Sequence, residues 1–399
     1  MKKLCLLVMI VVSGFSVLAA AKTCPSTLQT NLHTFENLSL GGEFRFWYYY
    51  VDQYDYQEQR SFDATYDFWS VKGIAEYELS ESLFAGIEAI VRKKEFSDDD
   101  FECDYASEDT QFNLRQLWID YESDAFIVHA GRSELASGNQ MVLDNFVDQV
   151  TVEFEVNDVS ISAGGGVLAN DVSREALSCQ REIVYEHHQC WKDFCIADWG
   201  DQRLGFVETR FSLFPKQYQR ALLLYTDSVF EEQNSVIADL YLHGTLGFGI
   251  KYFTELAVQK YHDDSALYSA ASFIFSKRFS FSKTAQQLQT GLIVAQRDGD
   301  RQFAPLYESL WIGERYRYSL YQGDIFYIKN TMKLEALEQL SVVTQYSQKF
   351  SGDKTDELDV GLNIALTDKY RVFITYSALN FIGDYEMTHQ LQLHTRLIF

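Results

Sequence analysis

Residues 389–399 read HQLQLHTRLIF, and this stretch decides the fold. Most of its odd positions are apolar, most of its even positions are polar, and the chain stops on the aromatic Phe399. Successive side chains of a β-strand point to opposite faces, so a period of two predicts a strand with one apolar and one polar face. We therefore expect the last strand to have one face toward an apolar environment and the other face toward water.

Segments of the same kind fill the chain. Residues 43–50 and 358–366 repeat the alternation, and residues 246–253 repeat it with two glycines on the second face. Counting such segments predicts about eighteen strands. They are expected near residues 38–52, 64–79, 83–94, 111–121, 125–134, 147–156, 158–168, 203–214, 218–228, 235–243, 245–261, 266–277, 286–297, 322–336, 340–350, 356–366, 370–379 and 385–399.

The connections between these strands alternate between short and long. Short ones include residues 80–82, 122–124, 214–217 and 367–369, and long ones fall around residues 53–63, 95–110, 135–146, 169–202 and 298–321. Outer-membrane barrels show the same alternation of connection lengths, with tight periplasmic turns and longer extracellular loops. The sequence therefore predicts an all-β protein, a transmembrane up-and-down antiparallel β-barrel. The chain has only 3 prolines, which fits a closed sheet, because proline is tolerated mainly on edge strands and a closed sheet has none.

The first residues predict an export signal. Lys2 and Lys3 precede an apolar run over residues 4–18, and Ala19 to Ala21 supply small residues for cleavage. The apolar run is short for a retained signal anchor. We therefore expect a signal peptide over residues 1–21, a short periplasmic segment over 22–37 and a single barrel over 38–399. The predicted location is the outer membrane of a Gram-negative bacterium.

Charge and motifs exclude several function classes. The chain has 34 Lys and Arg against 57 Asp and Glu, a formal net charge of −23, which disfavours nucleic acid as a partner. It carries no Gly-x-Ser-x-Gly, no His-Glu-x-x-His and no phosphate- or dinucleotide-binding glycine loop. His129 near Ser133 is the nearest approach to a catalytic pair, and a lone strand histidine is usually structural. We expect no enzyme and no cofactor.

Two resemblances narrow the class. The export signal, the strand pattern and the terminal Leu-Ile-Phe resemble bacterial outer-membrane porins, which implies that Phe399 is an assembly signal read by the barrel-assembly machinery. Residues 114–121, LRQLWIDY, followed by Gly131-Arg-Ser-Glu-Leu135 and Gly138, resemble the alginate-export family of eighteen-stranded barrels. That resemblance implies polysaccharide as one solute class. The chain lacks the basic surplus that a polyanion such as alginate would require.

The face opposite to the apolar one should line the pore. Arg132 and Glu134 are out of phase with this face, so they reach it only if a bulge redirects them. Mixed charges around a lumen favour a water-filled path that orients polar solutes. The predicted function is a porin or channel for passive diffusion or export of small polar solutes; the alternative is a non-conducting structural or surface-interaction barrel. The candidate pore-lining residues are Glu43, Arg45, Lys72, Glu76, Glu88, Arg92, Arg132, Glu134, Glu153, Lys251, Asp359, Arg371 and Arg396.

The long loops add two expectations. The acidic stretch from Asp98 to Asp109 could bind divalent cations that bridge it to lipopolysaccharide, although a solvated surface is the simpler interpretation. Cysteines in an exported protein favour disulfides over a metal site, so we expect pairing among Cys179, Cys190, Cys195 and Cys103 and no bound metal. A stapled loop over residues 169–202 would narrow the mouth. Partners should also include outer-membrane lipid.

Overall fold

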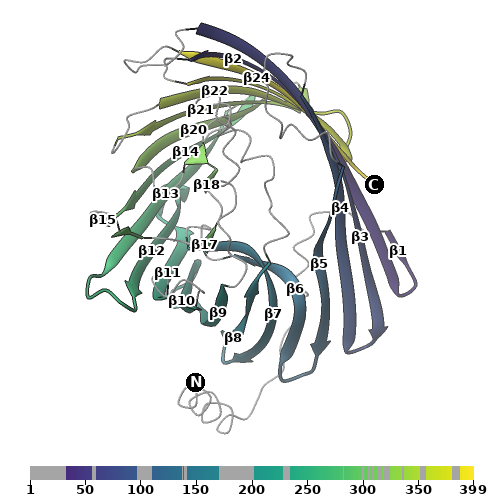
Figure 1. Cartoon of the computed structure of the whole chain (residues 1–399), viewed down its shortest axis with the longest axis vertical. Coiled ribbons are helices and arrows are strands. Elements are labelled where there is room, and N and C mark those ends of the chain that lie inside the picture. The colour runs from purple at the N-terminus through teal and green to yellow at the C-terminus, as the bar shows by residue number, and fades with distance from the viewer. Residues whose placement is uncertain are drawn as a thin grey trace.

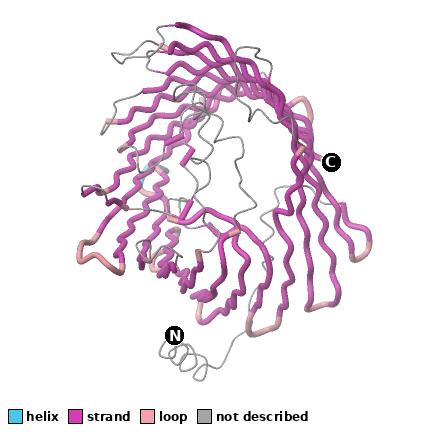
Figure 2. The backbone as a smooth tube through the Cα atoms, in the orientation of Figure 1, coloured by secondary structure: helices cyan, strands magenta, loops and turns pink. Residues whose placement is uncertain are grey.

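The computed structural model describes residues 33–55, 60–96, 110–136, 138, 142–169, 202–227, 234–281, 283–298, 301–303, 306–307, 310–311, 317–318, 324–334, 337–350, 356–379 and 387–399. Eighteen antiparallel strands follow one another around a closed ring (Figure 1). The ring closes where β2 pairs with β24, from Glu43 opposite Ile398 to Asp52 opposite His389. Strand dominates the tube view, with one short 3-10 turn among the described residues (Figure 2).

The wall strands have these bounds: β2 Leu38–Asp55, β3 Arg60–Ser80, β4 Leu83–Phe96, β5 Gln111–Glu122, β6 Ile127–Ala136, β7 Leu143–Val156, β8 Val159–Leu168, β9 Arg203–Phe211, β10 Gln217–Asp227, β11 Ser235–Thr245, β12 Lys251–Tyr261, β13 Tyr268–Ser280, β14 Thr284–Ala295, β20 Ile325–Leu334, β21 Leu337–Lys349, β22 Asp356–Ala365, β23 Tyr370–Leu379 and β24 Thr388–Ile398. Short additional strands are β1 His33–Phe35, β15 Arg297–Asp298, β16 Arg301–Gln302, β17 Leu306–Tyr307, β18 Leu310–Trp311 and β19 Arg317–Tyr318. The predicted count of eighteen wall strands and the predicted fold class are confirmed.

One predicted strand is wrong at its start. The alternation over residues 246–253 suggested a strand from 245 to 261, but β12 begins at Lys251 after a 3-10 turn, η2 (Gly247–Gly249). Phe248 has φ +60° and Gly249 φ +70°, and the amide of Leu246 donates to the carbonyl of Ile250 at 2.7 Å. Glycine tolerates this left-handed backbone. The two glycines therefore mark a turn and not the second face of a strand.

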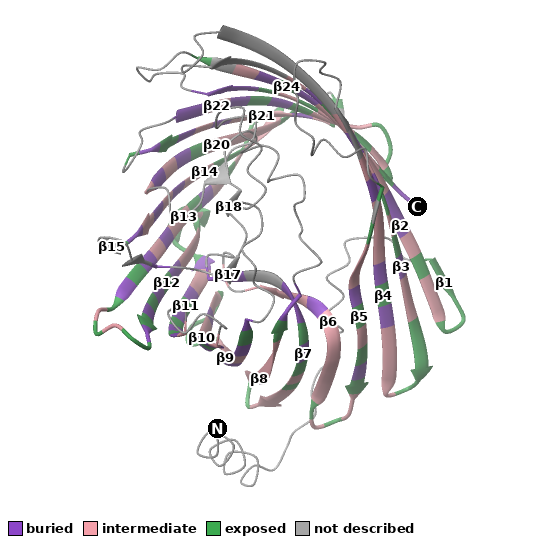
Figure 3. Ribbon diagram, in the orientation of Figure 1, coloured by how far each residue is buried: buried purple, intermediate pink, exposed green. Residues whose placement is uncertain are grey.

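Burial follows the predicted alternation along the strands (Figure 3). On β5, Leu117, Ile119 and Tyr121 are exposed on the outer face, whereas Gln116 and Asp120 are buried on the inner face. Soluble proteins show the opposite arrangement, with apolar side chains inside. Exposed apolar side chains on the outer wall of a closed barrel form the surface that faces lipid in membrane barrels.

The end of the β6–β7 hairpin leaves the wall. β5 begins at Gln111, yet β6 pairs with it only from Leu117 onward, so the loop-side part of β6 has no partner on β5. At the hairpin's far end, Leu143 pairs in parallel with Leu306 of β17. Figure 1 shows β17 inside the ring beside β7. Two segments from different loops are thus joined inside the barrel.

An apolar cluster attaches these segments to the inner wall. Val142, Leu143 and Phe303 are almost completely buried among inward-facing residues of β8 to β14 and β20. Their wall partners include Leu204, Phe206, Leu222, Leu224, Ile237, Tyr261, Ile293 and Ile325. The inner face of this part of the wall is therefore apolar toward the loop end. We call Val142, Leu143, Phe303 and these wall partners the inner apolar cluster.

Gly166 should be one of the least replaceable residues of the wall. A Cβ there would lie 2.2 Å from the carbonyl oxygen of Asp148 and 2.8 Å from Cα of Gln149, both on the neighbouring strand backbone. Gly166→Ala is expected to destabilise the barrel by about 1–3 kcal/mol through overpacking. The measurement is the temperature at which the folded band disappears in semi-native gels. Gly205→Ala is the matched control, because a Cβ at Gly205 would meet only one atom, at 4.0 Å; equal losses for both variants would contradict the prediction.

Several expectations fall outside the described residues: the signal peptide over residues 1–21, the acidic stretch over 98–109, and Cys103, Cys179, Cys190 and Cys195. Within the described residues, no helix is long and apolar enough to cross a membrane.

Candidate functional site: a charged lumen

Four cations and two carboxylates meet on the inner face of β2 to β5 and β24. Glu43 accepts hydrogen bonds from Arg45 and from Arg396, the latter at 2.7 Å between Nε and Oε2. Glu88 lies 3.2 Å from Nη1 of Arg115 and 3.7 Å from Nζ of Lys72. Both carboxylates are almost fully buried. We call Glu43, Arg45, Lys72, Glu88, Arg115 and Arg396 the arginine cluster.

A bulge brings Arg115 into this cluster. The register between β4 and β5 shifts after Glu88, which is opposite Gln116, so that Ala89 is opposite Leu114. Arg115 is thus the extra residue, and its side chain reaches Glu88 on the inner face. Bulges commonly redirect a side chain in this way. The guanidinium also lies 4.9 Å from the ring centre of the buried Phe146.

A stack of three rings lies beside the arginine cluster. The imidazole of His394 lies between Trp47 and Phe373, with centroid distances of 4.6 and 5.0 Å and interplanar angles of 9° and 18°. Arg45 sits 5.8 Å from the Trp47 ring centre. Stacked rings offer a flat apolar surface, and the guanidinium adds positive charge at its edge.

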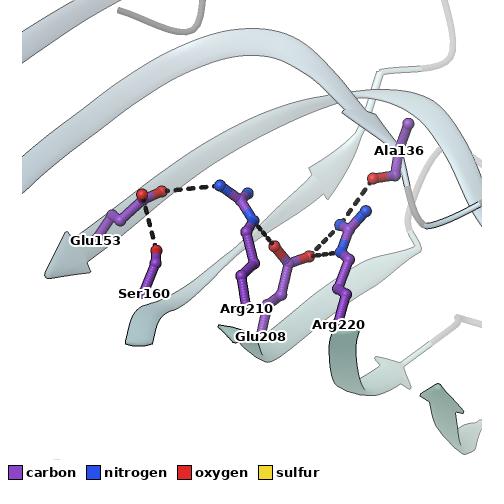
Figure 4. Close-up of polar contacts among 6 residues, drawn as sticks. All are labelled: Ala136, Glu153, Ser160, Glu208, Arg210 and Arg220. Atoms are coloured by element: carbon purple, nitrogen blue, oxygen red, sulfur yellow. Dashed lines mark hydrogen bonds and ion pairs between the residues drawn. The ribbon is translucent and has the colours of Figure 1, made fainter. Parts of the chain in front are cut away.

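A second charged group lies on β7 to β12, and Figure 4 shows part of it. Arg210 joins two carboxylates, with Nε 2.5 Å from Glu208 and Nη1 3.6 Å from Glu153. Glu208 also pairs with Arg220, whose Nη2 donates to the carbonyl oxygen of Ala136 at 2.8 Å. Together with the buried inward residues Asp239 and Glu255, these residues hold four carboxylates against two guanidiniums. We call Glu153, Glu208, Arg210, Arg220, Asp239 and Glu255 the acidic wall.

The acidic wall has two structural connections. At the turn end it borders a cavity of about 320 Å³, lined by Glu153, Glu155, Arg210, Tyr218 and neighbouring residues of the turns. The second connection is the bond from Arg220 to Ala136, which joins the acidic wall to the inward-folded hairpin (Figure 4). The polar network therefore links the turn-end cavity to the end of the β6–β7 hairpin inside the ring.

The two charged groups lie on different sides of the ring. β3, β4 and β5 form one side of Figure 1, and β10 to β12 lie across from them. The arginine cluster has more cations than carboxylates, and the acidic wall has more carboxyl groups than guanidiniums, so a field directed across the lumen is expected between them. Such a field orients dipolar solutes as they pass.

Most predicted pore-lining residues occupy the inner face. Glu43, Glu88, Arg92 and Asp359 are buried there, and Arg45, Lys72, Glu76, Glu153 and Arg396 share its register. Lys251 and Arg371 are exposed near the turn end of the same face. The arginine cluster brings together five of the predicted residues, namely Glu43, Arg45, Lys72, Glu88 and Arg396.

Arg132 does not lie on this face, and Glu134 stands on the same side of β6 as Arg132 but in the part of β6 that has left the wall. Arg132 is opposite the exposed Leu117 and donates to both carboxylate oxygens of Asp148, at 2.7 and 2.8 Å. The pairing of β6 with β7 runs without a register shift from Ile127 to Ala136, so no bulge redirects either residue. Both alternate with the inward Ser133 and stand on the opposite face of β6.

Sequence reasoning missed most of the acidic wall. On β9 the inner face carries Leu204 and Phe206 and then Glu208 and Arg210, so one face changes from apolar to polar along a single strand. A search for uniformly polar faces cannot detect this change. The sequence signal that could have revealed the acidic wall was the presence of charged residues near the short turns, such as Glu208 and Arg220.

Comparisons with solved structures find the same architecture in other proteins. OccAB4 of Acinetobacter baumannii is 10% identical with a TM-score of 0.56, and the match covers 91% of this chain and 99% of that one. OccK11 (OpdR) of Pseudomonas aeruginosa is 12% identical with a TM-score of 0.59, covering 91% and 96%. The chain has their fold. OpdK of P. aeruginosa, solved with vanillate, is 10% identical with a TM-score of 0.57, covering 90% and 98%.

Sequence comparisons add no family. No protein-family model matches the chain, and no curated protein matches it. The resemblance of residues 112–138 to the alginate-export family is therefore not supported, and the similar structures are Occ and Opd proteins instead. TM-scores of 0.56 and 0.59 show the shared barrel fold, and at 10–12% identity they show the fold alone.

Proposed function

We propose that the protein is a channel of the bacterial outer membrane that passes small polar solutes by diffusion. The observation that carries this proposal is the inverted polarity of the wall: buried carboxylates and guanidiniums line the inside of a closed ring, and apolar side chains cover its outside. Charged inner faces are characteristic of water-filled barrels. The Occ and Opd barrels, one of them described as the outer membrane protein OpdK, share the fold.

The arginine cluster and the ring stack suggest which solutes pass. Four cations against two carboxylates leave a local positive surplus, and the adjacent rings can contact an aromatic solute. Guanidiniums bind carboxylates with two parallel hydrogen bonds. OpdK was solved with vanillate, an aromatic carboxylate. We propose small organic acids, aromatic ones included, as the preferred solute class.

A second function is favoured by one observation. The inner apolar cluster fills part of the cross-section with hydrocarbon and anchors two loop segments there. A barrel blocked in this way would act as a structural or surface-interaction protein. The arginine cluster and the acidic wall nevertheless place polar side chains along the inner faces of strands on both sides of the ring, which favours the channel.

Planar-bilayer recording separates the two functions. The purified barrel is expected to produce stepwise current in potassium chloride, because an aqueous lumen conducts ions. Liposomes containing it should swell faster in vanillate or benzoate than in a neutral sugar of similar size. Folded barrels that insert without any current would favour the structural function.

Export and assembly complete the proposal. We propose that residues 1–21 are removed on export, that outer-membrane lipid and lipopolysaccharide surround the barrel, and that Phe399 serves the assembly machinery. In support, Phe399 closes the seam, because its backbone amide and carbonyl bond with those of Gly42 at 3.0 and 2.8 Å. Its side chain is exposed on the outer face.

A further inference from the structure

Three polar residues on β5 and β6 form a directed chain of hydrogen bonds on the inner face. Nδ1 of His129 lies 2.5 Å from Oδ1 of Asp120, and Nε2 of His129 lies 2.7 Å from Oγ of Ser133. Asp120 is buried, and 18% of the His129 side chain is exposed. This order of carboxylate, imidazole and hydroxyl is the arrangement that activates a serine nucleophile.

Neighbouring residues fix the direction of the protons. The side-chain amide of Gln149 donates to Oγ of Ser133 at 2.7 Å, and Thr151 donates to the amide oxygen of Gln149 at 3.2 Å. When the His129 ring carries its single proton on Nδ1, Asp120 accepts that proton and Nε2 is left as an acceptor. In that tautomer the Ser133 hydroxyl, whose oxygen accepts from Gln149, donates its proton to Nε2.

Gly131 makes this geometry possible. Residues four apart on a strand are normally far apart, but Gly131 stands between His129 and Ser133 with φ +128°. A Cβ at this position would lie 2.2 Å from the carbonyl oxygen of Leu117, so only glycine fits.

We propose that Ser133 is a catalytic nucleophile, with His129 as its general base, that hydrolyses small carboxylic esters entering the lumen. Oγ attacks the ester carbonyl, a new C–O bond forms, and the hydroxyl proton passes to Nε2 of His129. The ester C–O bond then breaks, and the alcohol leaves with that proton. Water, deprotonated by His129, then attacks the acyl-serine, the C–O bond to Ser133 breaks, Oγ takes the proton back from Nε2, and the carboxylic acid leaves. Gln149 holds Oγ of Ser133 through its side-chain amide, and Asp120 positions the ring.

This inference depends on the proposed function only in that esters must reach the lumen. It also connects to it, since hydrolysis of an ester yields the organic acid class proposed for the channel. Conductance and reactivity are separate measurements, so failure of one does not imply failure of the other.

The test uses a biotinylated fluorophosphonate on the full-length barrel in detergent. Attack by Oγ forms a P–O bond, expels fluoride and transfers the proton to His129. Mass spectrometry is expected to locate the label on Ser133. Ser133→Ala should abolish labelling, and His129→Gln should slow it at least about 100-fold, because a general base contributes at least that factor.

Controls separate chemistry from folding. Ser162→Ala should label at the wild-type rate, because Ser162 is an equally buried lumen serine opposite Glu153 and Glu208. Asp120→Asn should slow labelling at least about tenfold, and Asp120→Glu should restore part of it, as expected for a positioning carboxylate. Hydrolysis of p-nitrophenyl acetate should follow the same order. Failure to label Ser133 in a barrel that keeps its folded gel mobility would overturn the proposal, as would equal labelling of Ser162.

Discussion

Leu143→Asp is expected to raise the single-channel conductance by roughly a factor of two, because current rises as the open cross-section grows. Leu143 is about 1% exposed and lies in the inner apolar cluster with Val142 and Phe303. Burying a carboxylate there without a partner would cost several kcal/mol. Undocking of the hairpin end from the wall removes that cost.

The barrel itself should survive this change. The wall depends on strand pairing around the whole ring, whereas the hairpin end is attached through the cluster, the β17 pairing and the Arg220 bond to Ala136. Locally attached elements open before the global structure does. Only the inward-folded segments should therefore move, and folded gel mobility should remain.

Leu143→Met is the matched control, because a volume-conserving exchange usually costs less than about 1.5 kcal/mol. Its conductance should equal that of the wild type. If Leu143→Asp conducts like the wild type while folding normally, the hairpin end does not narrow the path. Arg220→Ala is expected to give a conductance between those of the wild type and Leu143→Asp, because it removes the bond to Ala136 but leaves the apolar contacts.

The wall was predictable because it obeys one local rule. Every strand crosses between lipid and lumen, so the alternation of side chains in the sequence reports both faces at once. Residues 389–399 were sufficient to identify β24, and the short turn near Thr367 marked the boundary between β22 and β23. The eighteen strands followed from repetition of the same signal.

The interior was less predictable because its inner faces carry apolar side chains where loop segments pack and charged side chains elsewhere. Leu222 and Leu224 face inward to bind the loop segments, while Arg220 on the same face binds Glu208. Nothing local distinguishes an inward leucine that packs against a loop from an outward leucine that faces lipid. The Asp120 partner of His129 was hidden for a different reason: it comes from the neighbouring strand, and register joins them.

Glu43→Gln is expected to shift the channel toward anions. Glu43 is the carboxylate that Arg45 and Arg396 share, so its neutralisation leaves two guanidiniums beside the lumen without their counter-charge. A unit charge about 8 Å from a passing ion changes its energy by about 0.5 kcal/mol in water, a factor of about two in permeability. The reversal potential in a potassium chloride gradient measures this ratio.

Arg45→Gln is the opposing variant and should shift the ratio toward cations by a similar factor. The double variant should return close to the wild-type ratio, because it removes one charge of each sign from the same place. Glutamine keeps the size of glutamate and still accepts hydrogen bonds, so the seam between β2 and β24 should hold. An unchanged permeability ratio in both single variants would show that ions do not pass close to the arginine cluster.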